Sequence, residues 1–407
     1  MIRARLLAAI QSPSVSAISR GAETAFELRG DRWSINIVAD KVGMSAGGSP
    51  RFQLQADDTT WSALLTQTPL AGWQSIVHLV RTGTVELHGS EVEYARHIHL
   101  VRALLDAARG ADDWHPDAPA RLLQARGEYQ RVSSALGTAD VYVERCGTGP
   151  ALLALATAGS DTSQWHGLMT QSDITERHEL VTVDLPWHGK SSPTFGTPLG
   201  GWRLKPATYT DFICRIADEL DMRRPVLVGA SMAGAAVVHA LARHPARFGG
   251  AVACQVGPRV RNRAAPQLRS ADIDQSLFVP EWTYGLMNPA SPAEYRKRVW
   301  WGYSSGGAGL YSADIASYEQ WEFDEVRPLL SESTPHIAVL SGAFDTTVPP
   351  SASRELAAVI PNSSFEEMPD LGHFPHAENP AVFATYLEKA LTRITQHDPL
   401  GPHLTTR

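Results

Sequence analysis

The chain has 407 residues, of which 43% are hydrophobic and 19% charged, a mixture typical of globular proteins that excludes a largely disordered chain. The formal net charge is −7 and no basic block occurs, which argues against a protein that binds nucleic acid. At roughly 150 residues per domain the length predicts two to three domains. Three widely spaced cysteines predict neither a disulfide framework nor a zinc cluster.

The first residues carry basic side chains followed by an apolar run of only five residues, Leu6 to Ile10. A secretory signal needs an apolar run of about 7–15 residues. A membrane span needs roughly 20 apolar residues, and no stretch of the chain approaches that length. We therefore expect no signal peptide, no membrane span and a cytoplasmic protein.

Residues 24–56 alternate polar and apolar side chains, which predicts half-buried antiparallel strands. The elements expected next are a helix near 58–65, an apolar segment at 73–80, a short strand at 84–87 and an amphipathic helix at 91–108. Together they predict a small α+β domain over residues 1–112. Residues 113–127 are rich in Asp, Ala and Pro and are expected to form a linker.

From residue 128 to about residue 400, apolar strand-like runs alternate with helical stretches. This alternation predicts an α/β domain with a mostly parallel sheet. The predicted strands are 151–155, 180–183, 225–228, 250–256 and 336–340. Residues 258–325 interrupt the alternation with many aromatic side chains, so we expect a helical lid over a pocket. The alternative is the core of an ordinary helical subdomain.

Two serines have the glycine-rich surroundings of a nucleophile. Ser304 lies in GYSSG, the literal Gly-x-Ser-x-Gly pattern, and Ser231 lies in GASMA. A nucleophilic serine needs a sharp turn between a buried strand and a helix, because that turn exposes its oxygen and offers helix N–H groups to an oxyanion. Ser231 follows an apolar strand and precedes good helix formers, whereas Ser304 precedes a glycine run and is expected in a lid loop. We therefore predict Ser231 as the nucleophile.

A serine nucleophile also needs a base and a carboxylate that orients the base. Asp345 follows a predicted strand and is expected at the carboxyl edge of the sheet, while His373 lies in a loop before the last helix. The order Ser231, Asp345, His373 is that of one fold class. His376 is a rival candidate for the base, and Asp370 for the acid.

With these segments in view, residues 128–396 resemble the α/β-hydrolase superfamily, in the lid-bearing branch of bacterial esterases, haloperoxidase-like enzymes and carbon–carbon bond hydrolases. The similar segments are GASMAG at 229–234, GAFD at 342–345, GH at 372–373 with Glu378 and Pro380, and DLPWHGKS at 184–191. The resemblance implies an eight-stranded, mostly parallel sheet. It also implies Ser231 as nucleophile, His373 as base and Asp345 as the orienting acid of a catalytic triad.

The chain departs from that family in two loops. The family usually has His-Gly after its third strand, where this chain has ATAGS at 156–160. This segment is expected to supply one oxyanion N–H from Ala158, with Thr157 as the alternative, and Met232 is expected to supply the other. Trp187 stands where the family usually has Gly. Its side chain either narrows the mouth of the pocket or simply packs against its neighbours.

The remaining predictions concern substrate and assembly. Four tryptophans are predicted to contact an apolar, fairly bulky substrate: Trp187, Trp282, Trp300 and Trp301. Residues 20–108 are similar to the sterol-carrier-protein-2-like (SCP2-like) fold on DRWSINI at 31–37, FQLQAD at 52–57 and TVELHG at 84–89. Such a domain holds a lipophilic molecule or serves in assembly. We favour assembly or lid support, and a second domain is compatible with a homodimer.

The sequence thus predicts a serine hydrolase that cleaves a carboxylic ester or lactone of apolar or aromatic character through an acyl-enzyme. One alternative is hydrolysis of a carbon–carbon bond in a ring-cleavage product. The other is a lipophile-binding protein with a vestigial triad. No metal-binding motif, phosphate loop or dinucleotide fingerprint occurs, so no metal or other cofactor is expected.

Overall fold

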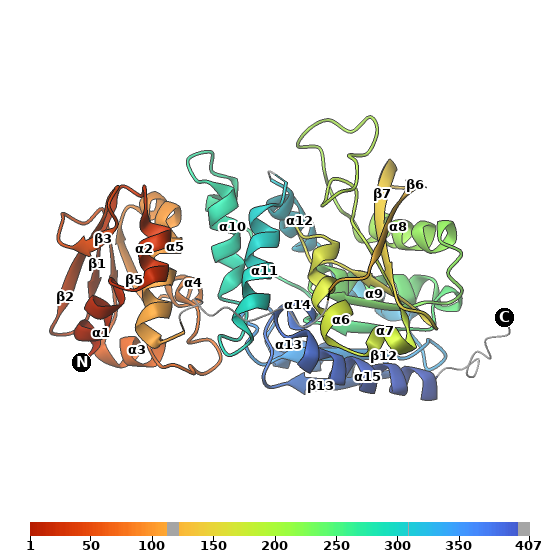
Figure 1. The fold of residues 1–407 in the computed structure, drawn as a ribbon. Coiled ribbons are helices and arrows are strands. Elements are labelled where there is room, and N and C mark those ends of the chain that lie inside the picture. The colour runs from red at the N-terminus through yellow and green to blue at the C-terminus, as the bar shows by residue number, and fades with distance from the viewer. Residues whose placement is uncertain (112–121, 308, 398–407) are drawn as a thin grey trace. The chain divides into compact units, whose positions relative to one another are not determined.

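The computed structural model describes residues 1–111, 122–307 and 309–397 (Figure 1). It divides into two compact units, an N-terminal unit of residues 1–118 and 266–300 and a C-terminal unit of residues 119–265 and 301–407. Most of the predicted linker at 113–127 lies outside the described residues. None of the helices in the described ranges combines the length and apolarity that crossing a membrane requires.

The N-terminal unit contains a five-stranded sheet in the order β3-β2-β1-β4-β5. Its strands are β1 (Thr24–Arg29), β2 (Ser34–Ala39), β3 (Met44–Ala46), β4 (Phe52–Gln55) and β5 (Glu86–Gly89). Its first helices are α1 (Ile2–Ala9), α2 (Pro13–Ser19), α3 (Asp58–Leu64), α4 (Ile76–Arg81) and α5 (Glu91–Arg109). Strand β1 is antiparallel to β2 but parallel to β4. The antiparallel prediction is wrong for that pair, because alternation fixes the buried face of a strand and not its direction.

Residues 266–300 belong to the same unit as the N-terminal sheet. They contain a short 3₁₀ turn (Pro266–Arg269), helix α10 (Gln275–Tyr284) and most of helix α11 (Ala293–Ser304). Helix α10 packs against α5, and Arg102 of α5 forms an ion pair of 2.7 Å with Glu281 of α10. The expected lid at 258–325 is therefore divided between the two units, with the boundary inside α11.

The C-terminal unit is built on an eight-stranded sheet in the order β13-β12-β11-β10-β8-β9-β7-β6. Its strands are β6 (Arg126–Ser134), β7 (Gly137–Cys146), β8 (Ala151–Leu155), β9 (Glu179–Val183), β10 (Val226–Ala230), β11 (Gly250–Cys254), β12 (Ile337–Gly342) and β13 (Ser363–Met368). The strands from β13 to β9 are parallel, and among the described strands only β7 is reversed, since it is antiparallel to both of its neighbours, β9 and β6. The predicted eight-stranded, mostly parallel sheet is confirmed.

Helices cover this sheet, and the central strands are buried along nearly their whole length (Figure 1). The helices are α6 (His166–Gln171), α7 (Ile174–Arg177), α8 (Pro206–Glu219), α9 (Met232–Arg243), α12 (Leu310–Tyr318), α13 (Pro350–Ala358), α14 (Pro375–Glu378) and α15 (Pro380–Gln396). Helices α6 and α15 share one apolar core with the strands, and α9 packs on β10 and β11. Burial on both faces explains why the strands are continuous apolar runs rather than alternating ones.

Strand β8 lies between β9 and β10, so the chain reverses its progress across the sheet there. In open α/β sheets, ligands bind at the carboxyl ends of the strands, in the crevice at such a reversal. The segments that leave β8 and β10 at this edge contain Ala158 and Ser231. The fold thus gathers the predicted site residues from distant parts of the sequence.

Candidate active site

Ser231 occupies the sharp turn between β10 and α9. Its backbone has φ 57° and ψ −124°, a conformation that non-glycine residues rarely adopt. Its N–H donates to the carbonyl of Cys254, the last residue of β11, over 2.9 Å. Strained backbone of this kind is concentrated at functional sites, where the surrounding structure holds it in place.

Small residues allow the tight approach of helix and strand at this turn. A Cβ on Gly229 would lie 2.6 Å from the Ala233 carbonyl carbon, and one on Gly234 would lie 2.5 Å from the Cys254 carbonyl oxygen. Both distances are far below a van der Waals contact, so any larger residue would force the backbone apart. The geometry of the turn therefore requires glycine at positions 229 and 234.

Ser304 has a different setting from Ser231. It is the last residue of helix α11, so the expectation of a lid loop at this position is wrong. The helix continues through GYS and ends only where the glycine run begins, because glycine is a poor helix former. Ser304 therefore lacks the strand-to-helix turn that a nucleophile of this kind needs.

His373 and Asp345 come together at the carboxyl edge of neighbouring strands, β13 and β12. The His373 Nδ1 lies 2.6 Å from Asp345 Oδ2, and both residues are buried. The other oxygen, Asp345 Oδ1, accepts the N–H groups of Thr347 at 2.7 Å and Val348 at 3.1 Å. The carboxylate is thus fixed from both sides and holds the imidazole in one orientation. Among the described residues, Ser231 Oγ forms no hydrogen bond.

Two further buried side chains hold the loop that carries His373. Glu378 accepts the N–H groups on either side of the histidine, from Gly372 at 2.9 Å and Phe374 at 3.2 Å. Gln255, which follows β11, donates to the Gly372 carbonyl at 2.5 Å and accepts the Gly342 N–H at 3.0 Å. Gln255 thereby links the acid and histidine loops. Gln255 is not among the residues predicted from the sequence, although a glutamine directly after a buried apolar strand was the available signal.

The rival residues have other surroundings. His376 is fully buried and stacks on Trp165 with 4.1 Å between ring centroids. Burial, with a smaller effect of the nearby His373, lowers the pKa of His376 to about 3. Within the described part of the chain neither of its ring nitrogens has a hydrogen-bond partner. Asp370 is exposed, and it is Asp345 that bonds the His373 ring.

The loop after β8 distinguishes the two predicted oxyanion donors. The Thr157 N–H donates to Gln164 Oε1 at 3.1 Å and is therefore occupied. The Ala158 N–H has no acceptor among the described residues. Because β8 and β10 are neighbours, this loop leaves the sheet beside the turn at Ser231. Met232 is the first residue of α9, where an N–H has no partner within the helix.

A buried carboxylate, Asp314 of α12, anchors the same loop. It accepts hydrogen bonds from the Gly159 N–H at 2.8 Å and from the Trp202 Nε1–H at 2.7 Å, and it pairs with His188 Nε2 at 2.9 Å. Burial alone would lower the pKa of His188, but the charge of Asp314 and its hydrogen bond outweigh this effect and raise it. This cluster was not predicted from the sequence, since no local pattern relates residues so far apart.

The four predicted tryptophans do not share one place. Trp187 has φ 75°, which explains the usual Gly at its position, and its indole donates to Thr194 Oγ1 at 3.2 Å. Trp301 is 68% exposed. Trp282 and Trp300 belong to the N-terminal unit, where Trp300 Nε1 donates to Glu281 at 2.8 Å. Their contact with substrate stays a prediction.

The buried His376 makes stability depend on pH. Its pKa is depressed in the folded chain, so below about pH 6.5 the unfolded chain binds the additional proton and the free energy of unfolding falls as the pH falls. We expect His376→Phe, which keeps an aromatic ring on Trp165, to reduce this loss between pH 7 and pH 5 in urea titrations. The exposed control His397→Gln should retain it. An unchanged pH dependence in His376→Phe would contradict the assignment.

The His188–Asp314 pair predicts the opposite dependence. The pKa of His188 is raised by folding, so its contribution is complete below about pH 6.5 and is lost as the pH rises through the folded-state value. Asp314→Asn should remove this loss, because burial then keeps the imidazole neutral. Urea titrations at pH 6 and pH 9 measure how far the free energy of unfolding falls between these two pH values. An equal fall in the unmodified chain and in Asp314→Asn would refute the charged pair.

Comparisons with known proteins agree with this geometry. The model of the Alpha/beta hydrolase family matches residues 151–386. Over 268 residues the chain is 24% identical to the dihydrolipoyllysine-residue acetyltransferase component of the acetoin cleaving system of Cupriavidus necator, a match that spans 61% of this chain and 66%, just under two thirds, of that protein.

Two solved structures have a similar fold. A thermophilic esterase from Thermogutta terrifontis is 20% identical with a TM-score of 0.56, over 66% of this chain and 99% of that one. The enol-lactonase from Burkholderia xenovorans LB400 is 18% identical with a TM-score of 0.56, over 65% of this chain and all of that one (100%). At such low identity these likenesses establish the fold alone. Because the family model matches more than half of this chain, the chain belongs to the alpha/beta hydrolase family.

Proposed function

We propose that the protein is a serine hydrolase that cleaves a carboxylic ester or lactone of apolar or aromatic character. The observation that carries the proposal is the 2.6 Å hydrogen bond between His373 and Asp345 at the sheet edge where Ser231 is held in a strained turn. A nucleophile, a base and an orienting carboxylate are the three parts that activation of a serine requires.

The tautomer follows from this hydrogen bond. When His373 Nδ1–H donates to Asp345, the other ring nitrogen, Nε2, is unprotonated and acts as the base. Ser231 Oγ attacks the substrate carbonyl as its proton moves to Nε2. Asp345 then stabilises the imidazolium. The hydrogen bond from Ser231 Oγ to Nε2 is expected to form when substrate binds, since catalytic hydrogen bonds are often unformed before that.

The developing oxyanion needs two N–H donors. We assign them to Met232, at the positive end of α9, and to Ala158, whose N–H is not engaged elsewhere among the described residues. The His373 imidazolium gives its proton to the leaving alcohol, which leaves an acyl-enzyme on Ser231. Water deprotonated by the same histidine then releases the acid.

Aromatic side chains support an apolar substrate. Tyr303 lies 5.6 Å, between ring centroids, from both Tyr311 and Phe374, and its hydroxyl bonds Thr157 Oγ1 at 2.8 Å. This cluster therefore contacts the loop after β8, through Thr157, and the loop that carries His373, through Phe374. The names of the two similar structures, esterase and enol-lactonase, agree with an ester or lactone substrate. For residues 1–112 we propose an SCP2-like domain that serves in assembly or lid support.

Removing the nucleophile tests the proposal. Ser231→Ala should lower kcat on p-nitrophenyl esters by roughly 10⁴-fold or more, because the residual oxyanion site cannot replace the attacking oxygen. Ser304→Ala is the matched control and should keep its activity. Near-full turnover by Ser231→Ala would end the proposal, and loss in the Ser304 variant alone would transfer the role to that serine.

A substitution of Asp314 tests whether the loop at 156–160 aligns an oxyanion donor. We expect Asp314→Asn to lower kcat by about 10–100-fold with little change in KM, because the loop loses its charged anchor and the Ala158 N–H its alignment. Asp324→Asn, whose side chain is 85% exposed, is the control for loss of one negative charge. A change confined to KM, or none, would show that Asp314 does not align the donor.

A further inference from the structure

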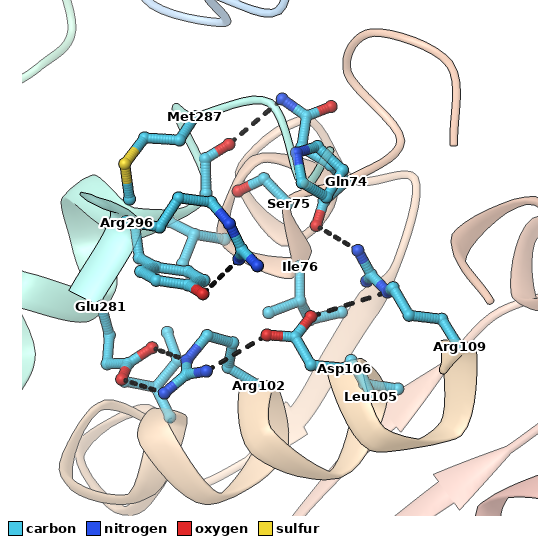
Figure 2. A pocket seen from close by; sticks show the side chains of 15 residues that line it. Gln74, Ser75, Ile76, Arg102, Leu105, Asp106, Arg109, Glu281, Met287 and Arg296 are labelled. Carbon is cyan, nitrogen blue, oxygen red and sulfur yellow. Dashed lines mark hydrogen bonds and ion pairs between the residues drawn. The ribbon is translucent and has the colours of Figure 1, made fainter. Parts of the chain in front are cut away.

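Two buried polar networks join segments that are far apart in the sequence. One lies in the N-terminal unit around a cavity of about 30 Å³, where Arg102 of α5 pairs with Asp106 of the same helix and with Glu281 of α10 (Figure 2). The predicted catalytic residues all lie outside it, in the C-terminal unit. The other network lies in that unit and centres on Gln255, the residue after β11.

The backbone of Gln255 is held in an unusual conformation. Gln255 is fully buried and has φ 53°, a left-handed value that favours glycine. Its N–H donates to the carbonyl of Leu340 in β12 at 2.9 Å. Buried strain of this kind persists only where the surroundings hold it, and it is concentrated at functional sites. The strain therefore points to a role for this residue in the site.

The side-chain amide of Gln255 bridges the acid and histidine loops where their backbones meet. A Cβ on Gly342 would lie 2.4 Å from the Gly372 carbonyl oxygen, so the two backbones are in direct contact. Gln255 Nε2 donates to that same carbonyl at 2.5 Å, and Oε1 accepts the Gly342 N–H at 3.0 Å. One partner only accepts and the other only donates, so the amide fits in a single orientation. Asp345 lies three residues after Gly342, and His373 directly follows Gly372.

The backbone of Gln255 also reaches the turn of the nucleophile. The peptide group between Cys254 and Gln255 presents its carbonyl to the Ser231 N–H at 2.9 Å. The φ angle of Gln255 sets how this peptide group is oriented relative to the Gln255 side chain. A Cβ on Gly234 would lie 2.5 Å from the same carbonyl oxygen, so α9 packs directly on it. Gln255 thus contacts the nucleophile, acid and histidine loops through one peptide group and one amide.

We propose that Gln255 is a positioning residue that sets the place of the Ser231 turn relative to the His373–Asp345 pair. This inference rests on the proposed function, since it concerns how that site is assembled. The amide touches no reacting atom and acts through the backbones of the three loops. Because Gln255 is fully buried, the substrate does not contact it, and the effect falls on kcat rather than on KM.

Gln255→Met tests the link, because it keeps the length of the side chain and removes both of its hydrogen bonds. We expect kcat on p-nitrophenyl esters to fall by about 10–100-fold with little change in KM, since a small misplacement of catalytic groups is costly. Gln320→Met, at an exposed glutamine of the same unit, is the matched control and should keep the kcat of the unmodified chain. Unchanged kcat in Gln255→Met, or a change confined to KM, would overturn the proposal.

Gln255→Glu separates positioning from folding, and it decides the proposal if Gln255→Met does not fold. The introduced carboxyl donates to the Gly372 carbonyl only when it is protonated. Burial and the carboxylates of Asp345 and Glu378, which belong to the same loops, favour the protonated form. We expect the ratio of kcat in this variant to kcat in the unmodified chain to rise roughly tenfold from pH 8 to pH 6, the effect of one regained hydrogen bond.

A charge effect alone would change this ratio in the opposite direction. A negative charge near His373 favours its protonated form, which cannot act as the base, so the ratio would then fall as the pH falls. A low ratio that stays constant or falls between pH 8 and pH 6 would overturn the proposal.

A measurement without substrate distinguishes this inference from the proposed function. The 2.6 Å hydrogen bond between His373 and Asp345 should give a proton NMR signal far downfield, which is identified by its loss in His373→Gln. We expect Gln255→Met to shift or broaden this signal and Gln320→Met to leave it unchanged. If the unmodified chain hydrolyses no ester and Ser231 reacts with no fluorophosphonate, the proposed function fails. A shifted signal in Gln255→Met would still support the role of Gln255 in positioning the pair, and an unchanged signal would overturn it.

Discussion

The close packing of helix α9 against strands β10 and β11 is the constraint on which the site depends. With glycine at 229 and 234, the helix backbone approaches the strands so closely that no Cβ fits. The chain between them must then turn at Ser231 with a positive φ of 57°. Strain of this kind costs about 1–3 kcal/mol. The packing of the buried sheet around the turn offsets this strain and holds the serine at the carboxyl edge.

Around this turn, the site is held by buried polar groups from distant segments. Gln255 joins the acid and histidine loops, Glu378 fixes the backbone on both sides of His373, and Asp314 holds the loop at Gly159. Each buried carboxylate is satisfied by two or more donors, as burial of a charge requires. Because these contacts join separate loops, the positions of the proposed base and of the proposed oxyanion donors are coupled through the packing of the C-terminal unit.

Much of this could be predicted from the sequence, because strong local patterns carry it. Apolar runs located the central strands β8 to β12 of the C-terminal sheet, but not β6, β7 and β13. The strand-to-helix context favoured Ser231 over Ser304. The Asp314 cluster could not be predicted, since its partners Gly159, His188 and Trp202 meet only through tertiary packing. The division of residues 258–325 between the two units could not be predicted for the same reason. A high density of aromatic side chains does not show which unit buries them.

The central claim is that the turn at Ser231 and the pair of His373 with Asp345 make one serine oxygen reactive. Labelling the intact protein with a fluorophosphonate, followed by mass mapping of the modified peptide, measures this directly. We expect a single adduct on Ser231, and we expect it to form much more slowly in His373→Gln. An adduct on another serine, or equally fast labelling in that variant, would contradict it.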